Sequence, residues 1–184
     1  MALTATIYRL HIALSDVDRG VYEALDLRLA RHPSETLRYL ITRTLAYCLS
    51  YEDGVAFSKG GLSSTDEAPV AIHDPTGRLL AWIDVGSPSA ERLHKASKAA
   101  DRVAIFTTVD PAQLQREAAA KGVFRAEDVE IFRLDPAFVE ALEPLIERKT
   151  ALEVLHTEGH LYVTVDGQTF ESALERASLA PPEA

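Results

Sequence analysis

The strongest chemical signal in the sequence is an aspartate near the end of an apolar stretch. Asp84 belongs to Leu79–Val85, which is otherwise almost wholly apolar and is predicted to be a buried β-strand. A buried carboxylate without a partner is costly, so Asp84 must be hydrogen-bonded, ion-paired or bound to a metal. The carboxyl ends of strands are also where α/β sheets place ligands. The sequence leaves open whether Asp84 takes part in chemistry or only braces the turn that follows.

Several catalytic patterns are missing from the chain. It has no GxxxxGK[ST] phosphate loop, no GxGxxG after a strand, no HExxH and no GxSxG elbow. The six histidines lack metal-ligand spacing, and a single cysteine, Cys48, excludes an internal disulfide and a cysteine zinc cluster. The remaining set of carboxylates and lysines suits divalent metal and phosphodiester chemistry. Mg²⁺ prefers carboxylate oxygens and water, and a lysine can assist the attacking water.

The elements around Asp84 are expected to form a parallel crossover. Ser87 is a candidate N-cap for a helix over Pro88–Ala100, and Val103–Thr107 returns as a second apolar strand. A short helix between two buried strands implies a right-handed connection. On the exposed side of this helix, Glu91 and Lys95 are spaced for a surface ion pair.

A second helix is predicted upstream, with Ser34 as its N-cap. Its apolar face recurs at three- and four-residue spacing as far as Cys48. Glu35, Arg38 and Thr42 fall on the opposite face. The simple explanation of Glu35 is a carboxylate placed in the first turn by the helix dipole.

The rest of the chain predicts a mixed α/β fold. We expect an N-terminal hairpin of Thr4–Leu14 and Val21–Ala30, and an antiparallel pair in which Val70–Ile72 joins Leu79–Val85 through the turn HDPTG. Helices are expected at 110–120 and 136–146, a strand at 129–134, and a C-terminal β-meander at 151–172. Together these elements predict a central mixed sheet with flanking helices.

Composition indicates a single domain over residues 1–184 and a cytoplasmic protein. The hydrophobic content is 47% and the charged content 26%, no apolar run is long enough to span a membrane, and the N-terminus does not read as a signal peptide. The net charge of −9 argues against wrapping nucleic acid. However, residues 28–43 carry +3 and residues 91–102 carry +2, so the chain can still offer a local basic face; chance clustering of charge on solvated helices is the alternative.

The chain resembles the YaeQ family of small bacterial proteins. The shared motifs are MALTATIYR, LARHPSET, HDPTG, WIDVGSPSAERLHKAS and VAIFTT, and the resemblance runs from Met1 to about the last ten residues. It implies a divergent PD-(D/E)xK nuclease-like core, also called restriction endonuclease-like. That core consists of a helix, an antiparallel pair, a crossover helix and a further strand. The order of elements expected between Ser34 and Thr107 agrees with it.

The resemblance also implies roles for individual residues. Asp84 takes the place of the acidic residue on the third core strand, and Glu35 that of the helix glutamate. The pattern has a lysine two positions after the aspartate, where this chain has Gly86. The lysine is then expected from the crossover helix, at Lys95 or Lys98.

One expected ligand is missing. The first aspartate of the nuclease pattern belongs where many family members have EPDLW, and here Pro69 stands at that position. Glu67 and Asp74 are the candidate replacements. The implied metal set is therefore Asp84 and Glu35 with one of these two acids, and the implied cofactor is Mg²⁺.

The sequence leaves two functions open. The favoured one is a nuclease-like fold that no longer cuts and acts as a binding module for nucleic acid or for a protein partner. The alternative is a Mg²⁺-dependent nuclease that hydrolyses phosphodiester bonds with Glu35, Asp84 and Lys95. No membrane partner is expected.

Overall fold

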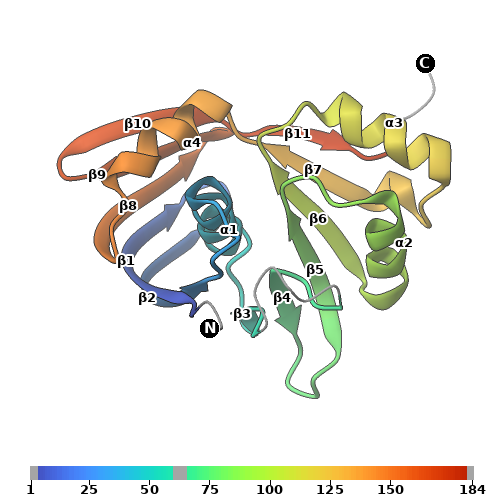
Figure 1. Ribbon diagram of the computed structural model, residues 1–184, viewed down its shortest axis with the longest axis horizontal. Coiled ribbons are helices and arrows are strands. Elements are labelled where there is room, and N and C mark those ends of the chain that lie inside the picture. Colours follow the sequence, from blue (N-terminus) through green and yellow to red (C-terminus); the bar gives the residue numbers. More distant parts are fainter. Residues whose placement is uncertain (1–3, 60–65, 182–184) are drawn as a thin grey trace.

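The computed structural model describes residues 4–59 and 66–181 and contains two mixed β-sheets (Figure 1). Sheet A has the order β10-β9-β8-β1-β2 and consists of β1 (Thr6–Asp16), β2 (Val21–Arg31), β8 (Lys149–Thr157), β9 (His160–Val165) and β10 (Gln168–Ala173). Sheet B has the order β11-β7-β6-β5-β4-β3 and consists of β3 (Val55–Phe57), β4 (Val70–His73), β5 (Leu79–Val85), β6 (Arg102–Thr107), β7 (Val129–Arg133) and β11 (Glu175–Ser178).

The helices separate and cover the sheets. They are α1 (Leu37–Leu49), α2 (Ala90–Ala99), α3 (Pro111–Lys121) and α4 (Pro136–Leu142), with short 3₁₀ segments at η2 (Ala126–Asp128) and η3 (Glu143–Leu145). Figure 1 shows α1 between the two sheets, α4 beside sheet A, and α2 and α3 on the far face of sheet B. Within the described residues, no helix is long and apolar enough to cross a membrane.

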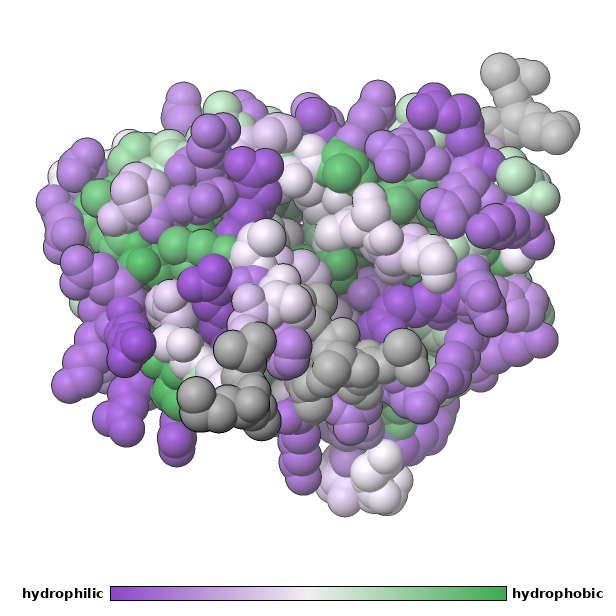
Figure 2. Space-filling view, in the orientation of Figure 1, coloured by the Kyte–Doolittle hydropathy of each residue, from purple (hydrophilic) through white to green (hydrophobic). Residues whose placement is uncertain are grey.

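Two hydrophobic cores follow from this arrangement. The larger core joins the inner face of sheet A to α1, α4 and one face of sheet B. The smaller core lies between the other face of sheet B and the helices α2 and α3, around Trp82, Leu93 and Ile105. Hydrophilic side chains cover most of the face seen in Figure 2, and the apolar ones gather at the left, over α1, α4 and sheet A.

The mixed α/β fold expected from the sequence is confirmed, including the N-terminal hairpin and the C-terminal meander. The crossover is also as predicted, since β5 pairs with β6 in parallel and α2 connects them. The sequence did not reveal that the hairpin and the meander form one sheet. Parallel pairing of β1 with β8 joins them, and register pairs such as Arg9 with Lys149 are too distant in the chain for local patterns to indicate.

Three predicted helix ends were wrong. The N-cap of α1 is Thr36, whose hydroxyl accepts the Tyr39 amide at 3.1 Å, so Glu35 precedes the helix. Ser34 instead contacts the ring of His32. The N-cap of α2 is Ser89, not Ser87. The helix α4 ends at Leu142, because Pro144 cannot continue the α-helical hydrogen bonding and the chain tightens into η3.

Candidate functional site

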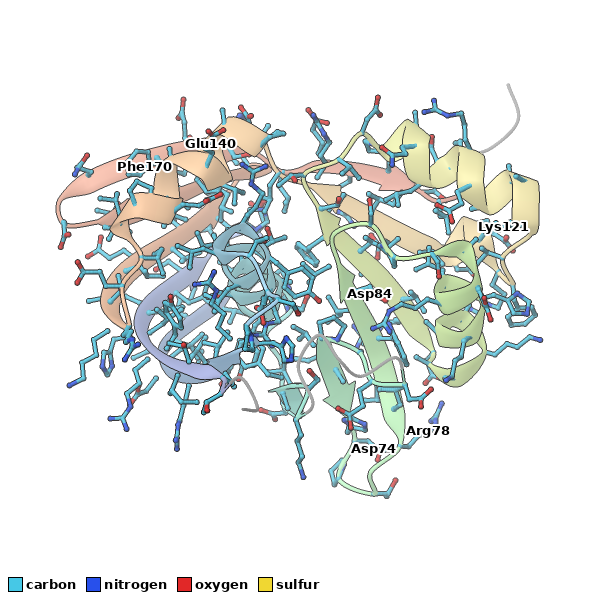
Figure 3. The ribbon with its side chains drawn as sticks, in the orientation of Figure 1. Asp74, Arg78, Asp84, Lys121, Glu140 and Phe170 are labelled. Carbon is cyan, nitrogen blue, oxygen red and sulfur yellow. The ribbon has the colours of Figure 1, made fainter. Side chains whose placement is uncertain are left out.

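Asp84 lies inside the protein at the carboxyl end of β5, 3% exposed (Figure 3). Its Oδ2 accepts a hydrogen bond from Trp82 Nε1 at 2.9 Å and forms an ion pair with Arg92 Nε at 2.7 Å. Its Oδ1 accepts the Val85 amide at 3.2 Å. Arg92 also lies over the Trp82 ring, 5.1 Å from its centroid. The guanidinium therefore neutralises the carboxylate and stacks on the indole beside it.

Glu35 is a second buried carboxylate, 1% exposed, and it pairs with Arg43 on α1. Arg43 Nη2 lies 3.0 Å from Glu35 Oε1 and 3.4 Å from Oε2, and the His32 amide donates to Oε2 at 3.3 Å. Burial raises the pKa of Glu35, and the Arg43 charge opposes this shift. Among the described residues, Glu35 Oε1 accepts and Arg43 Nε donates no hydrogen bond of good geometry. The prediction that Glu35 lies on the exposed side of the helix was wrong, because the side chain points into the space between the sheets.

Tyr39 lies between these two carboxylates. Burial raises the pKa of its phenol to about 12, and the charges of Asp84 and Glu35 add to the shift. The ring packs against the turn after β5, where Gly86 adopts a φ of +84° and a Cβ at this glycine would lie 3.9 Å from the ring. The Gly86 amide donates to the Phe106 carbonyl at 2.9 Å, which ties this turn to β6.

The other residues predicted for the site lie elsewhere. Lys95 is exposed on α2 and pairs with Asp66, which lowers the pKa of that aspartate, rather than with Glu91. Lys98 is exposed on the same helix. Asp74 is in the β4–β5 turn, far from Asp84 in Figure 3. Its carboxylate accepts the Thr76 hydroxyl at 2.6 Å and the Thr76 and Arg78 amides at 2.8 and 3.0 Å.

The segment expected to supply a third acid is closer to Asp84. The Glu67 carbonyl accepts a hydrogen bond from Arg92 Nη2 at 2.9 Å, so this segment is held against the guanidinium that neutralises Asp84. The contact uses the Glu67 backbone. Part of the neighbouring stretch, residues 60–65, lies outside the described residues.

This arrangement does not fit a Mg²⁺ ion. Each of the two buried carboxylates is bound by an arginine, whereas Mg²⁺ needs free carboxylate oxygens in octahedral geometry. Across the described residues, no group of three or more His, Cys, Asp or Glu side chains could hold a metal ion. The charges of Asp84 and Glu35 both act on the Tyr39 phenol, and the structure gives each carboxylate its own arginine.

Comparisons with known proteins agree on the family. The family model described as "YaeQ protein" matches residues 1–174. The chain belongs to the YaeQ family. A YaeQ protein of Escherichia coli K12, itself described as uncharacterized, is 28% identical over 172 residues, which cover 93% of this chain and 94% of the relative.

Solved YaeQ structures have the same fold. The crystal structure of YaeQ from Xanthomonas axonopodis pv. citri matches with a TM-score of 0.84 and 31% identity, covering 97% of this chain and all of that one. The YaeQ structure from Pseudomonas syringae matches with a TM-score of 0.85 and 32% identity, covering 95% and 96%. The two-sheet architecture is therefore shared with these YaeQ proteins.

Sequence reasoning missed three residues of this YaeQ site: Arg43, Arg92 and Tyr39. Arg92 had a signal, because it lies inside the motif WIDVGSPSAERLHKAS on the helix that follows Asp84, and a buried aspartate needs a cation. Arg43 had a weaker one, since it falls eight residues after Glu35 on a largely apolar helix whose other charged residue is Arg38. Tyr39 had none beyond its helical position.

Proposed function

We propose that this YaeQ protein has a nuclease-like core that does not cleave phosphodiester bonds, and that it binds nucleic acid. The order α1-β3-β4-β5-α2-β6, with β3, β4 and β5 antiparallel and β5 and β6 parallel, matches the core that the family resemblance implies. That match supports the nuclease-like part of the proposal.

The observation that carries the proposal is the ion pair between Asp84 and Arg92. A two-metal or one-metal nuclease needs this carboxylate to bind the cation that activates water. Here Arg92 Nε occupies Oδ2 at 2.7 Å and Trp82 Nε1 donates to the same oxygen, so a cation would have to displace both. The lysine expected to assist attack, Lys95, is engaged with Asp66.

Binding is assigned to the outer face of sheet A, which carries a row of unpaired cations. Arg28, Arg9 and Lys149 are register neighbours on β2, β1 and β8, and all three are exposed. No ion pair with a described carboxylate neutralises them, so the row can face phosphate groups. Beside the row lies an open trough of about 520 Å³ that includes Ala13 and Ala151.

Acidic residues of this face, Asp26, Glu153 and Asp166, line the trough rather than the row itself. Asp26 is paired with His11 at 3.3 Å, and Glu153 lies further along β8. The cations are therefore at one end of the sheet, where they can contact the phosphates of a nucleic acid backbone. Such contacts favour weak, salt-sensitive binding and do not read base sequence.

Fluorescence anisotropy with labelled single- and double-stranded DNA and RNA tests the binding. We expect affinity that falls steeply with salt, and that falls further in the variant Arg9→Glu/Lys149→Glu. The matched control is Lys98→Glu/Lys121→Glu, which makes the same change in net charge on α2 and α3. Absence of binding at low salt would overturn nucleic acid as the partner and favour a protein.

Nuclease assays and calorimetry test the other part of the proposal, the absence of phosphodiester cleavage. With Mg²⁺ or Mn²⁺ we expect no cleavage of any of these substrates. In calorimetry we expect the natural sequence and Asp84→Ala to give the same heat on metal addition. Cleavage by the natural sequence that disappears in Asp84→Ala would establish the alternative, a Mg²⁺-dependent nuclease.

A further inference from the structure

The free edge of sheet A has a sequence that is complementary to itself. β2 is the last strand of the sheet, so one side of its backbone has no neighbouring strand in the described structure. It is long, with eleven residues, whereas β10 at the opposite edge has six and the edge strands of sheet B, β3 and β11, have three and four. An exposed edge of this length is a ready template for another strand.

β2 lacks the backbone features that commonly prevent edge pairing, although it carries four charged residues. Its sequence VYEALDLRLAR contains no proline or glycine, and its register with β1 runs without a bulge from Val21 to Arg31. Natural sheets commonly protect such an edge with proline, a bulge or a short strand. The regular geometry of β2 therefore permits a further strand to pair along it.

The charged residues of β2 lie at equal distances on either side of Leu27 and are opposite in sign. If two copies of β2 pair antiparallel with Leu27 opposite Leu27, then Asp26 lies opposite Arg28 of the second copy and Glu23 lies opposite its Arg31. Leu25 then faces the second Leu29. Opposite charges and apolar pairs directly across an antiparallel ladder are stabilising, whereas like charges are not.

The monomer leaves Arg28 and Asp26 poorly satisfied, whereas Arg31 already donates to the Glu35 carbonyl and to the Tyr8 hydroxyl. Arg28 has Arg9 as its register neighbour and no ion pair within the described residues, although like charges directly opposite each other are unfavourable. Asp26 contacts His11, an exposed pair. A second β2 would bring a carboxylate beside Arg28 and a guanidinium beside Asp26.

The apolar side chains would also continue across the pair. Leu25, Leu27 and Leu29 point to the inner face of sheet A and are 8%, 7% and 1% exposed. In the symmetric pairing they would meet their counterparts and extend the inner leucine layer over a ten-stranded sheet. Near one end, Arg43 Nη2 already binds the Ala30 carbonyl at 3.1 Å, and a carbonyl can accept a second hydrogen bond.

We infer that the β2 edge is a homodimer interface, in which two copies of the chain pair their β2 strands antiparallel about Leu27. The interface is isologous, because each copy contributes the same strand, and it closes after two copies. The proposal does not depend on whether the outer face of sheet A binds nucleic acid.

Sedimentation velocity from micromolar to millimolar concentration tests the dimer. We expect reversible dimerisation by the natural sequence, and a dissociation constant raised about tenfold or more in Asp26→Arg, which places two arginines opposite each other at two positions in each dimer. The charge-swapped variant Asp26→Arg/Arg28→Asp restores opposite charges and should restore the dimer. Glu153→Arg, on the outer face of the interior strand β8, is the matched control and should dimerise normally.

Circular dichroism of each variant confirms that the fold is intact before its association is compared. A natural sequence that stays monomeric over the whole range would overturn the proposal. So would dimerisation that is equally strong in Asp26→Arg and in the charge-swapped variant, because the Asp26–Arg28 register would then not form the contact. Hydrogen exchange gives an independent readout, since the β2 amides should become more protected as concentration rises.

Discussion

The two sheets of this YaeQ protein differ in how much of each is covered. Sheet B has helices on both faces and ends in strands of three and four residues, and it holds Asp84 in its interior. In the part of the chain that the structure describes, sheet A has helices on one face only, and Arg9, Arg28 and Lys149 on its open face form no ion pair. The charges that resemble a catalytic centre are thus enclosed with their own counter-ions, while the charges available to partners are on the other sheet.

Breaking the Glu35–Arg43 pair should have the largest effect. Arg43→Met leaves a buried carboxylate without its cation and is expected to reduce the free energy of unfolding by about 3–5 kcal/mol, measured by urea denaturation at neutral pH. The double variant Glu35→Leu/Arg43→Met removes both charges and should recover most of the loss. A small loss in Arg43→Met would mean that the region between the sheets is not closed to water.

Removing Arg92 should cost less. Arg92→Ala is expected to reduce the free energy of unfolding by about 1–3 kcal/mol, because the Arg92 side chain is 21% exposed and Asp84 keeps its bonds to Trp82 and Val85. Lys95→Ala, one turn further along α2, removes an exposed contact with Asp66 and should leave the melting temperature unchanged. Equal effects of the two changes would contradict the difference between the interior and the surface of α2.

The phenol of Tyr39 should titrate late. Its folded-state pKa is about 12, against an ordinary value of 10.0, so the neutral phenol is favoured in the folded protein. The stability linked to this group is complete below pH 10 and is lost as the pH rises through 12. The difference in phenolate absorbance between the natural sequence and Tyr39→Phe isolates this titration. A midpoint near the ordinary value would show that the phenol is not buried in the folded protein.

A change on the open face should have the smallest effect. Arg9→Gln removes one of two arginines that are register neighbours, so stability should stay within about 0.5 kcal/mol and shift, if at all, toward greater stability. Added salt should abolish the difference, since these side chains are exposed. A loss of several kcal/mol would mean that this face is not open.

Local patterns predicted most of the individual elements. The apolar run of β5 and the crossover to β6 agree with the sequence, because burial and alternation are visible in neighbouring residues. The need for a partner at Asp84 was also predictable from its apolar surroundings. The choice of partner was not, because Arg92 and Lys95 lie on the same helix and only its rotation on sheet B decides which one reaches the carboxylate.

Pairings between segments that are distant in the sequence could not be predicted from local patterns. The inward position of Glu35 follows from the N-cap at Thr36, one of two hydroxyl residues that flank this glutamate. Whether Thr36 or Ser34 is the N-cap depends on the path of the chain from β2 into α1, which local sequence does not indicate. The parallel pairing of β1 with β8 likewise depends on the whole chain having folded.

The backbone at Gly86 disfavours a lysine at this position. The nuclease pattern has a lysine here, but a φ of +84° disfavours any residue with a side chain by about 1–2 kcal/mol. The substitution Gly86→Lys would therefore strain the turn and place its Cβ against the Tyr39 ring, while Asp84 would remain bound to Arg92. Hydrolytic chemistry at this place would therefore require coordinated changes at several positions rather than one substitution.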